Sequence, residues 1–96
     1  MSKLTILAHV HAQPDQVEGV RAQLEGLVGP TRAEAGCIQY DLHQDDQDPA
    51  HFVFYENWES REAWQAHMQS EHIAQWRAFA AEAVAHSALH EMSHIA

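Results

Sequence analysis

The sequence has a single cysteine, few basic side chains and no long apolar run. Cys37 alone cannot form an intramolecular disulfide, which suits a reducing cytoplasm. Five Lys and Arg stand against 14 Asp and Glu, so the net charge of −9 would repel a nucleic-acid backbone. Apolar stretches fall far short of the roughly 20 residues of a membrane span, and the N-terminus reads as a strand rather than a signal peptide. We expect a cytoplasmic protein that binds neither nucleic acid nor membrane.

The residues that are present suffice for one globular domain. A chain of 96 residues has room for a single domain, spanning 1–96. Hydrophobic residues make up 46%, the usual share of a folded protein, so disorder is not expected. Nine histidines are unusual for this length, and we expect most of them on solvated surfaces or strand faces.

Hydrophobic alternation predicts four strands. Each is rich in β-branched or aromatic residues, the last less regularly than the others. The predicted strands cover residues 3–12, 37–44, 51–58 and 87–95. Strand 51–58 is the most informative, because Phe52 and Phe54 point to one side and Val53 and Tyr55 to the other. A strand that is apolar on both faces is expected to be covered on both faces.

Helical spacing predicts two helical regions between these strands. The first opens at Gln13-Pro14-Asp15, is interrupted at Gly29-Pro30, and resumes briefly before Gly36 closes it. The second consists of two segments, with Ser60 and Ser70 as their N-caps. The same caps place His67 near the end of one segment and His72 at the start of the next.

The element order β-α-β-β-α-β predicts an α+β, ferredoxin-like antiparallel sheet. Both helical regions then cross over to the same face of the sheet and leave the other face bare. An exposed apolar face of that size would be unfavourable in a lone subunit. Two copies related by a two-fold axis would bury it, so the sequence predicts a homodimer.

Polar residues gather where this fold should be apolar. Glu56 shares a strand face with Phe52, Phe54 and Trp58, and two histidines, His67 and His72, lie on helical stripes that should face the sheet. Buried polar groups need partners, so these three side chains are expected to bind one another, the backbone or a ligand. Two interpretations stay open: a Glu–His bond that locks a helix junction to a strand, or a proton-transfer site in a pocket.

An ordered set of residues resembles a known family. The set runs Arg32-x-Glu34-x-Gly36-Cys37-x-x-Tyr40, Asp48-Pro49, Tyr55-Glu56-x-Trp58-x-Ser60, His67 and Ser70-x-x-His72. It resembles the antibiotic biosynthesis monooxygenase (ABM) domain, and most of all the small bacterial quinol-monooxygenase-like members. The resemblance implies a dimeric α+β barrel. It also implies oxidation of a quinol-like or aromatic phenolic small molecule by O₂, with no metal or other cofactor.

The resemblance also implies roles for individual residues. His67 or His72 would take a proton from the substrate, and Glu56 would orient the imidazole. The expected substrate-binding side chains are Asn57, Trp58, Tyr40 and Trp76. The sequence leaves open which face of strand 51–58 lines the pocket, and the tryptophans are better explained as core than as stacking partners of a ligand.

Other functions stay open at this point. The family also contains haem-degrading enzymes and an isomerase. A cofactor-free isomerase or lyase acting on a small metabolite, or a non-catalytic ligand-binding dimer, would fit the same residues. A specific metal site is not expected: His9-x-His11 is at most part of one, and no Cys cluster or HExxH motif is present.

Overall fold

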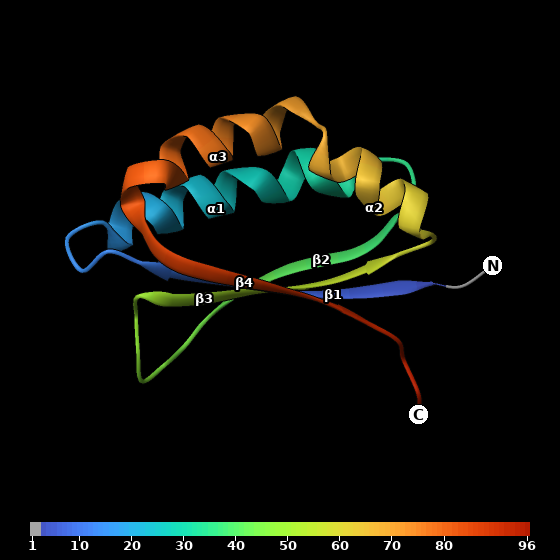
Figure 1. Cartoon of the computed structure of the whole chain (residues 1–96), viewed down its shortest axis with the longest axis horizontal. Coiled ribbons are helices and arrows are strands. Elements are labelled where there is room, and N and C mark those ends of the chain that lie inside the picture. Colours follow the sequence, from blue (N-terminus) through green and yellow to red (C-terminus); the bar gives the residue numbers. More distant parts are fainter. Residues whose placement is uncertain (1–2) are drawn as a thin grey trace.

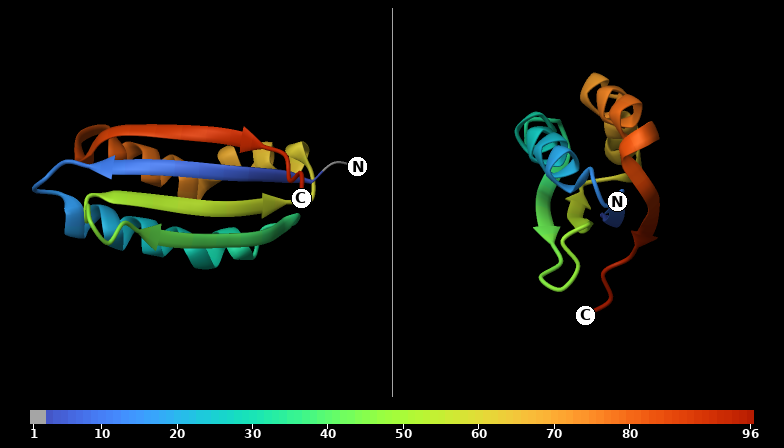
Figure 2. Two further views of the ribbon diagram at one scale, coloured as in Figure 1. Left: turned by 90° about the horizontal axis from the view of Figure 1, so that it is seen from below. Right: turned by 90° about the vertical axis from the view of Figure 1, so that its left-hand side faces the viewer.

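The computed structural model describes residues 3–96, which form a four-stranded antiparallel sheet with three helices on one face (Figure 1). The elements are β1 (Leu4–Ala12), α1 (Val17–Arg32), β2 (Cys37–Gln44), β3 (His51–Trp58), α2 (Arg61–Met68), α3 (Glu71–Ala83) and β4 (Val84–Met92). The strand order is β2-β3-β1-β4 (Figure 2), which confirms the predicted α+β, ferredoxin-like fold. None of the three helices is long and apolar enough to cross a membrane.

The first helix differs from the prediction at both ends. It begins after Gln16 rather than at Gln13-Pro14-Asp15, and it continues unbroken through Pro30. A proline inside a helix removes one hydrogen bond and crowds the carbonyl four residues earlier, here that of Gly26. The helix ends two residues after Pro30, so little of it is affected. Gly36, with φ +86°, lies in the turn to β2, because the helix already ends at Arg32.

The two serine caps predicted for the second helical region are confirmed. Ser60 Oγ accepts a hydrogen bond from the Ala63 amide at 3.1 Å, and Ser70 Oγ accepts one from the Ile73 amide at 3.4 Å. Each bond satisfies one of the free N–H groups at a helix start. The second cap also separates α2 from α3. His67 and His72 lie on either side of this break, which therefore sets the direction of their side chains.

The last strand begins three residues earlier than predicted. α3 ends at Ala83 and β4 starts at Val84, with no loop between them. Pairing with β1 sets these limits, since Ala12 lies opposite Val84 and Thr5 opposite Met92. The local pattern of residues 84–86 carries no such signal, so tertiary pairing decides the element here.

Alternate residues of β3 settle which face of the sheet meets the helices. Phe52, Phe54, Glu56 and Trp58 are all buried beneath the helices. They pack with the inner residues of the other elements, among them Ile6, Val10, Val20, Leu24, Tyr40 and Ile73. Simple alternation would place Ile38 on the same side as Tyr40. It is instead 49% exposed, because an irregularity between Cys37 and Gln39 shifts the strand register.

The opposite face of the sheet has no helix over it (Figure 2). We call it the open face. The strand registers place six histidines on it: His9, His11, His43, His51, His86 and His90. Five of their rings are in contact across β3, β1 and β4, with the His11 and His86 centroids 4.1 Å apart. The prediction that most histidines lie on strand faces is therefore confirmed.

Candidate functional site

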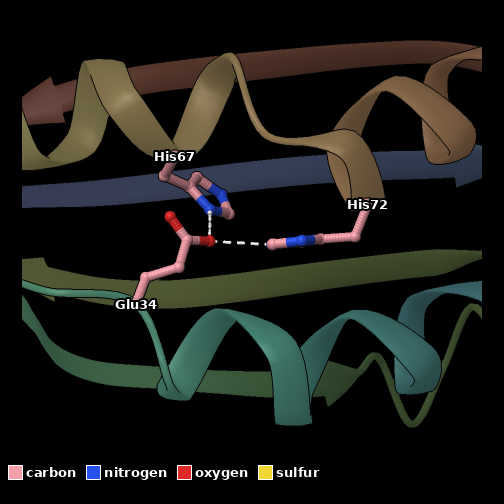
Figure 3. Close-up of side chains that lie close together, drawn as sticks. All are labelled: Glu34, His67 and His72. Carbon is pink, nitrogen blue, oxygen red and sulfur yellow. Dashed lines mark hydrogen bonds and ion pairs between the residues drawn. The ribbon is translucent and has the colours of Figure 1, made fainter.

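Three polar side chains from different parts of the chain meet beneath the helices. Glu34 lies in the turn after α1, His67 in the last turn of α2 and His72 in the first turn of α3. Glu34 Oε2 lies 2.7 Å from Nδ1 of His67 and 2.7 Å from Nε2 of His72 (Figure 3). We call these three residues the Glu34 trio.

The helix ends around the trio are held by local hydrogen bonds. Ser70 Oγ donates to the His67 carbonyl at 2.7 Å while capping α3, so one side chain fixes both sides of the α2–α3 break. On the other side, the Glu34 amide donates to the Thr31 carbonyl, and the Glu34 carbonyl accepts from the Cys37 amide. The three residues of the trio therefore lie in or beside short turns that are held by hydrogen bonds.

The hydrogen bonds to the shared carboxylate oxygen determine which nitrogen of each imidazole carries a proton. An ionised Glu34 only accepts hydrogen bonds, so Nδ1 of His67 and Nε2 of His72 must each carry a proton toward it. In neutral His67 this leaves Nε2 with a lone pair, and no other described residue hydrogen-bonds to that atom. A carboxylate that holds an imidazole by Nδ1 and frees Nε2 is the arrangement of a general base.

Burial and charge act on His67 in opposite directions. Only 2% of its side chain is exposed, and this burial lowers the pKa of His67, whereas the Glu34 carboxylate raises it. The pKa is lowered on balance, which keeps the imidazole neutral at neutral pH. His67 can therefore accept a proton under ordinary conditions.

A cavity of about 460 Å³ lies between the sheet and the helices, next to the trio. Its size is within the range of small-molecule sites. Apolar side chains from α1, β2, β3 and α3 form most of its wall: Leu24, Leu27, Tyr40, Phe54, Ile73 and Trp76. Glu56, His67 and Arg77 are the acidic and basic side chains on its helix-covered side, and Leu89 on β4 adds to the rim.

Glu56 is a second buried acid on the cavity wall. Its Oε1 accepts a hydrogen bond from the indole Nε1 of Trp58 at 2.9 Å. Burial raises the pKa of Glu56 to about 7, partly offset by this bond. Near neutral pH the carboxyl is therefore divided between a hydrogen-bond donor and an anion. Burial also raises the pKa of Tyr40, so that phenol stays protonated.

The structure brings four of the seven predicted site residues to the cavity wall: Glu56, His67, Tyr40 and Trp76. Trp58 is fully buried behind it, with its ring centroid 4.8 Å from that of His67. His72 does not line the cavity; it shares Glu34 Oε2 with His67, and the two ring centroids lie 5.9 Å apart. The imidazole is oriented by Glu34 rather than by Glu56, whose Oε1 is bonded to Trp58 instead.

Asn57 lies on the open face, away from the cavity. Its amide nitrogen donates to Gln39 at 2.8 Å, and its carbonyl accepts from Thr5 at 2.6 Å. Gln39 in turn donates to Asp41. The alternation along β3 explains the difference, because Glu56 points toward the helices and the next residue must point away from them.

No sequence pattern assigns a role to Glu34. The residue belongs to the motif Arg32-x-Glu34-x-Gly36, which by itself indicates only the family resemblance. A carboxylate in a turn after a helix is ordinarily solvated, and no periodicity gives it a buried position. Its partners are 33 and 38 residues away, so only the fold brings them together.

Comparison with known proteins agrees with this fold. The chain matches the antibiotic biosynthesis monooxygenase family over residues 4–78. Rv0793 of Mycobacterium tuberculosis, provisionally named a monooxygenase, is 36% identical over 77 residues, covering 80% of this chain and 75% of the relative. The crystal structure of PA3566 from Pseudomonas aeruginosa superposes with a TM-score of 0.96 at 33% identity, over 100% of this chain and 97% of the other.

A solved structure described as an antibiotic biosynthesis monooxygenase gives a TM-score of 0.89 at 31% identity, covering 97% of this chain and 99% of that one. A ferredoxin-like sheet with an apolar cavity and a buried, carboxylate-bound histidine beside it defines the class of this small α+β protein. The chain belongs to the antibiotic biosynthesis monooxygenase family. This membership supports a monooxygenase type of function, and proteins of the family are commonly dimeric.

Proposed function

We propose that this protein is a cofactor-independent monooxygenase that oxidises a quinol-like or aromatic phenolic molecule with O₂. A deprotonated phenol is rich enough in electrons to reduce O₂ directly. In the overall reaction a ring C–H and the phenolic O–H give a quinone. One oxygen atom enters the new carbonyl, the other leaves as water, and the substrate supplies the four electrons that this requires.

The observation that carries the proposal is a buried His67 on the wall of an apolar cavity, held through Nδ1 by Glu34. Nε2 then takes the phenolic proton, and the carboxylate stabilises the imidazolium that forms. His72 has a positioning role, since its bond to the same oxygen holds the Glu34 carboxylate in place. An apolar wall favours both an aromatic guest and O₂ over water.

The other groups on the wall bind the substrate. Glu56, with a pKa of about 7, can donate a hydrogen bond to a phenolate oxygen or accept one from a second hydroxyl. Tyr40 offers a protonated phenol, and Trp76 offers a flat apolar surface. Arg77 is a cation on the same wall and favours an anionic form of the guest.

We further propose that the protein is a homodimer in which the open face of each copy covers the other. Leu7, Val53 and Tyr55 lie there beside the histidines, and Tyr55 is exposed in the single chain. Apolar side chains on an uncovered sheet face favour such pairing. Sedimentation of the wild type and of Tyr55→Asp at micromolar concentration tests this, with a dimer expected only for the wild type. A wild-type monomer would contradict it.

The reaction is tested by oxygen uptake with a panel of hydroquinones and anthrones, using protein treated with a chelator and shown to be free of flavin. His67→Asn is the informative variant, because its amide nitrogen can replace Nδ1 as donor to Glu34 while the basic Nε2 is lost. We expect turnover to fall at least about 100-fold, the ordinary size of a general-base contribution. His94→Asn, at an exposed position, is the matched control and should keep full activity.

Three results would contradict the proposal. Undiminished turnover by a folded His67→Asn would remove this base from the reaction. Turnover that persists without O₂ would favour the isomerase or lyase alternative. Thermal stabilisation by aromatic ligands with no conversion of any of them would favour a binding module.

A further inference from the structure

We propose that the Glu34 trio is also a binding site for a transition-metal dication of the zinc class. Glu34, His67 and His72 supply one carboxylate oxygen and two imidazole nitrogens, and these three atoms lie within 4.8 Å of one another. Among residues 3–96 this is the one group of three His, Cys, Asp or Glu ligand atoms brought so close.

The geometry requires little change to accept an ion. Zinc binds nitrogen at about 2.0–2.1 Å and carboxylate oxygen at about 2.0–2.2 Å, so tetrahedral ligand atoms stand about 3.3 Å apart. Each nitrogen of the trio is now 2.7 Å from Glu34 Oε2. A metal would need each N–O distance to lengthen by about 0.6 Å and the two nitrogens, which lie within 4.8 Å of each other, to stand at about that same spacing of roughly 3.3 Å. Figure 3 shows both imidazoles directed at the same carboxylate oxygen.

The donor set selects the kind of metal. Two imidazoles and one carboxylate suit zinc, cobalt or iron(II), whereas calcium and magnesium prefer oxygen ligands throughout. The carboxylate offsets part of the charge of the ion, and the net charge of −9 favours any cation. Three protein ligands leave a fourth position for water or for a group from the neighbouring cavity.

The site is firmly built and can be reached from solvent. His67 is almost fully buried, but 22% of the His72 side chain and 17% of the Glu34 side chain are exposed. An ion can thus approach from the His72 side without passing through the cavity. Ser70 fixes the break between the two helices that carry the histidines, so the ligands are held in place before an ion arrives.

The histidines of the open face are the competing site. His9 Nδ1 and His51 Nε2 lie 2.9 Å apart, which gives a pair of nitrogens but no third ligand within the same radius. A pair of nitrogens binds a metal more weakly than a set of three ligands. The experiment must therefore distinguish metal bound at the Glu34 trio from metal bound by the histidines of the open face.

A metal in the trio would switch off the proposed base, an inference that rests on the proposed function. Coordination through Nδ1 of His67 needs the lone pair of that atom, so the ring proton moves to Nε2. Nε2 is then a donor and cannot take a proton from the substrate. Zinc would act as an inhibitor that a chelator reverses, and the oxygenation itself would involve no metal.

The experiment uses Co²⁺ absorption and Zn²⁺ calorimetry on the chelator-treated protein, and neither readout needs a substrate. We expect one equivalent of Co²⁺ to give the intense visible bands of a four-coordinate site. His72→Gln is the key variant, because its amide can still donate to Glu34 where Nε2 did, while the imidazole ligand is lost. Affinity for both ions should fall at least about 100-fold, more than the loss of an outer hydrogen-bond partner causes.

Two further variants complete the test. Glu34→Gln should weaken binding by a similar factor, and its fold is checked by circular dichroism. His51→Gln, on the open face, should leave the Co²⁺ bands unchanged. Weak six-coordinate bands in the wild type, or bands lost in His51→Gln and kept in His72→Gln, would overturn the proposal. Because binding is measured directly, an enzymatically inactive protein would refute the proposed function without affecting this result.

Discussion

Replacing Glu56 by Gln should stabilise the protein at alkaline pH and leave it nearly unchanged at acid pH. The folded-state pKa of Glu56 is about 7, against an ordinary 4.5, because the carboxyl is buried. A carboxyl whose pKa is raised in the folded state does not lower the free energy of unfolding below pH 4.5, where it is protonated in both the folded and the unfolded chain. Between pH 4.5 and 7 the unfolded chain ionises more readily, so stability is lost as the pH rises.

The rise in pKa sets the size of the effect. At 1.36 kcal/mol per pKa unit, an increase from 4.5 to about 7 corresponds to about 3 kcal/mol of free energy of unfolding lost by pH 8. Glutamine has nearly the same shape, carries no charge and can still accept the bond from Trp58 Nε1 through its amide oxygen. The variant should therefore recover most of those 3 kcal/mol at pH 8.

Urea denaturation of both proteins at one protein concentration, from pH 4 to pH 9, measures this difference. Only the difference between the two curves matters, since other titrating groups act equally on both. Glu82→Gln, which removes an exposed carboxylate from α3, is the control and should show no such trend. If Glu56→Gln is no more stable than the wild type at pH 8, or if the difference does not grow with pH, the reasoning fails.

Three other predictions concern a turn, helix α1 and the open face. Gly36→Ala should lower the free energy of unfolding by about 2–4 kcal/mol, because φ is +86° and the added Cβ would meet Ala63 Cβ at 2.5 Å. Gly26→Ala, where nothing lies within 4 Å of the added Cβ, should instead stabilise α1 by about 0.5–1 kcal/mol. Thermal unfolding measures both glycine variants, and an equal change in stability for the two would contradict both predictions. Burial and neighbouring imidazoles lower the pKa of His11, so its contribution to stability is present above pH 6.5 and is lost as the pH falls. Replacing His11 by Gln should reduce the loss of stability between pH 7 and pH 5 in urea titrations, and an unchanged slope would count against it.

The fold could be predicted from the sequence because its signals are local. Alternation in β1 and β3 and the serine caps of α2 and α3 are each set within a few residues, and the order of the elements then limits the topology. The start of β4 was predicted wrongly because it depends on a distant contact, the pairing of Val84 with β1. The break expected at Pro30 does not occur because α1 ends two residues later, so the proline disturbs little of the helix.

The candidate site could be predicted only in part for the same reason. His67 was expected to be buried because it lies on an apolar helical stripe, and it is. The choice of Glu56 as its partner followed from the apolar neighbours of that residue, and Glu56 is buried too. Two buried groups need not meet, however. Glu34, in a turn that carries no pattern of burial, is the residue that the fold places against His67.

The direct passage from α3 into β4 has a consequence for how this scaffold can diversify. With no loop at Ala83 and Val84, one inserted residue would turn every later side chain of β4 to the opposite face, and Leu89 would leave the cavity rim. Length changes are thus poorly tolerated on this side, whereas the turn at residues 45–50 can absorb them. New substrate preferences should arise by exchanging single wall residues, so a mutant library confined to those positions samples most of what this pocket can become.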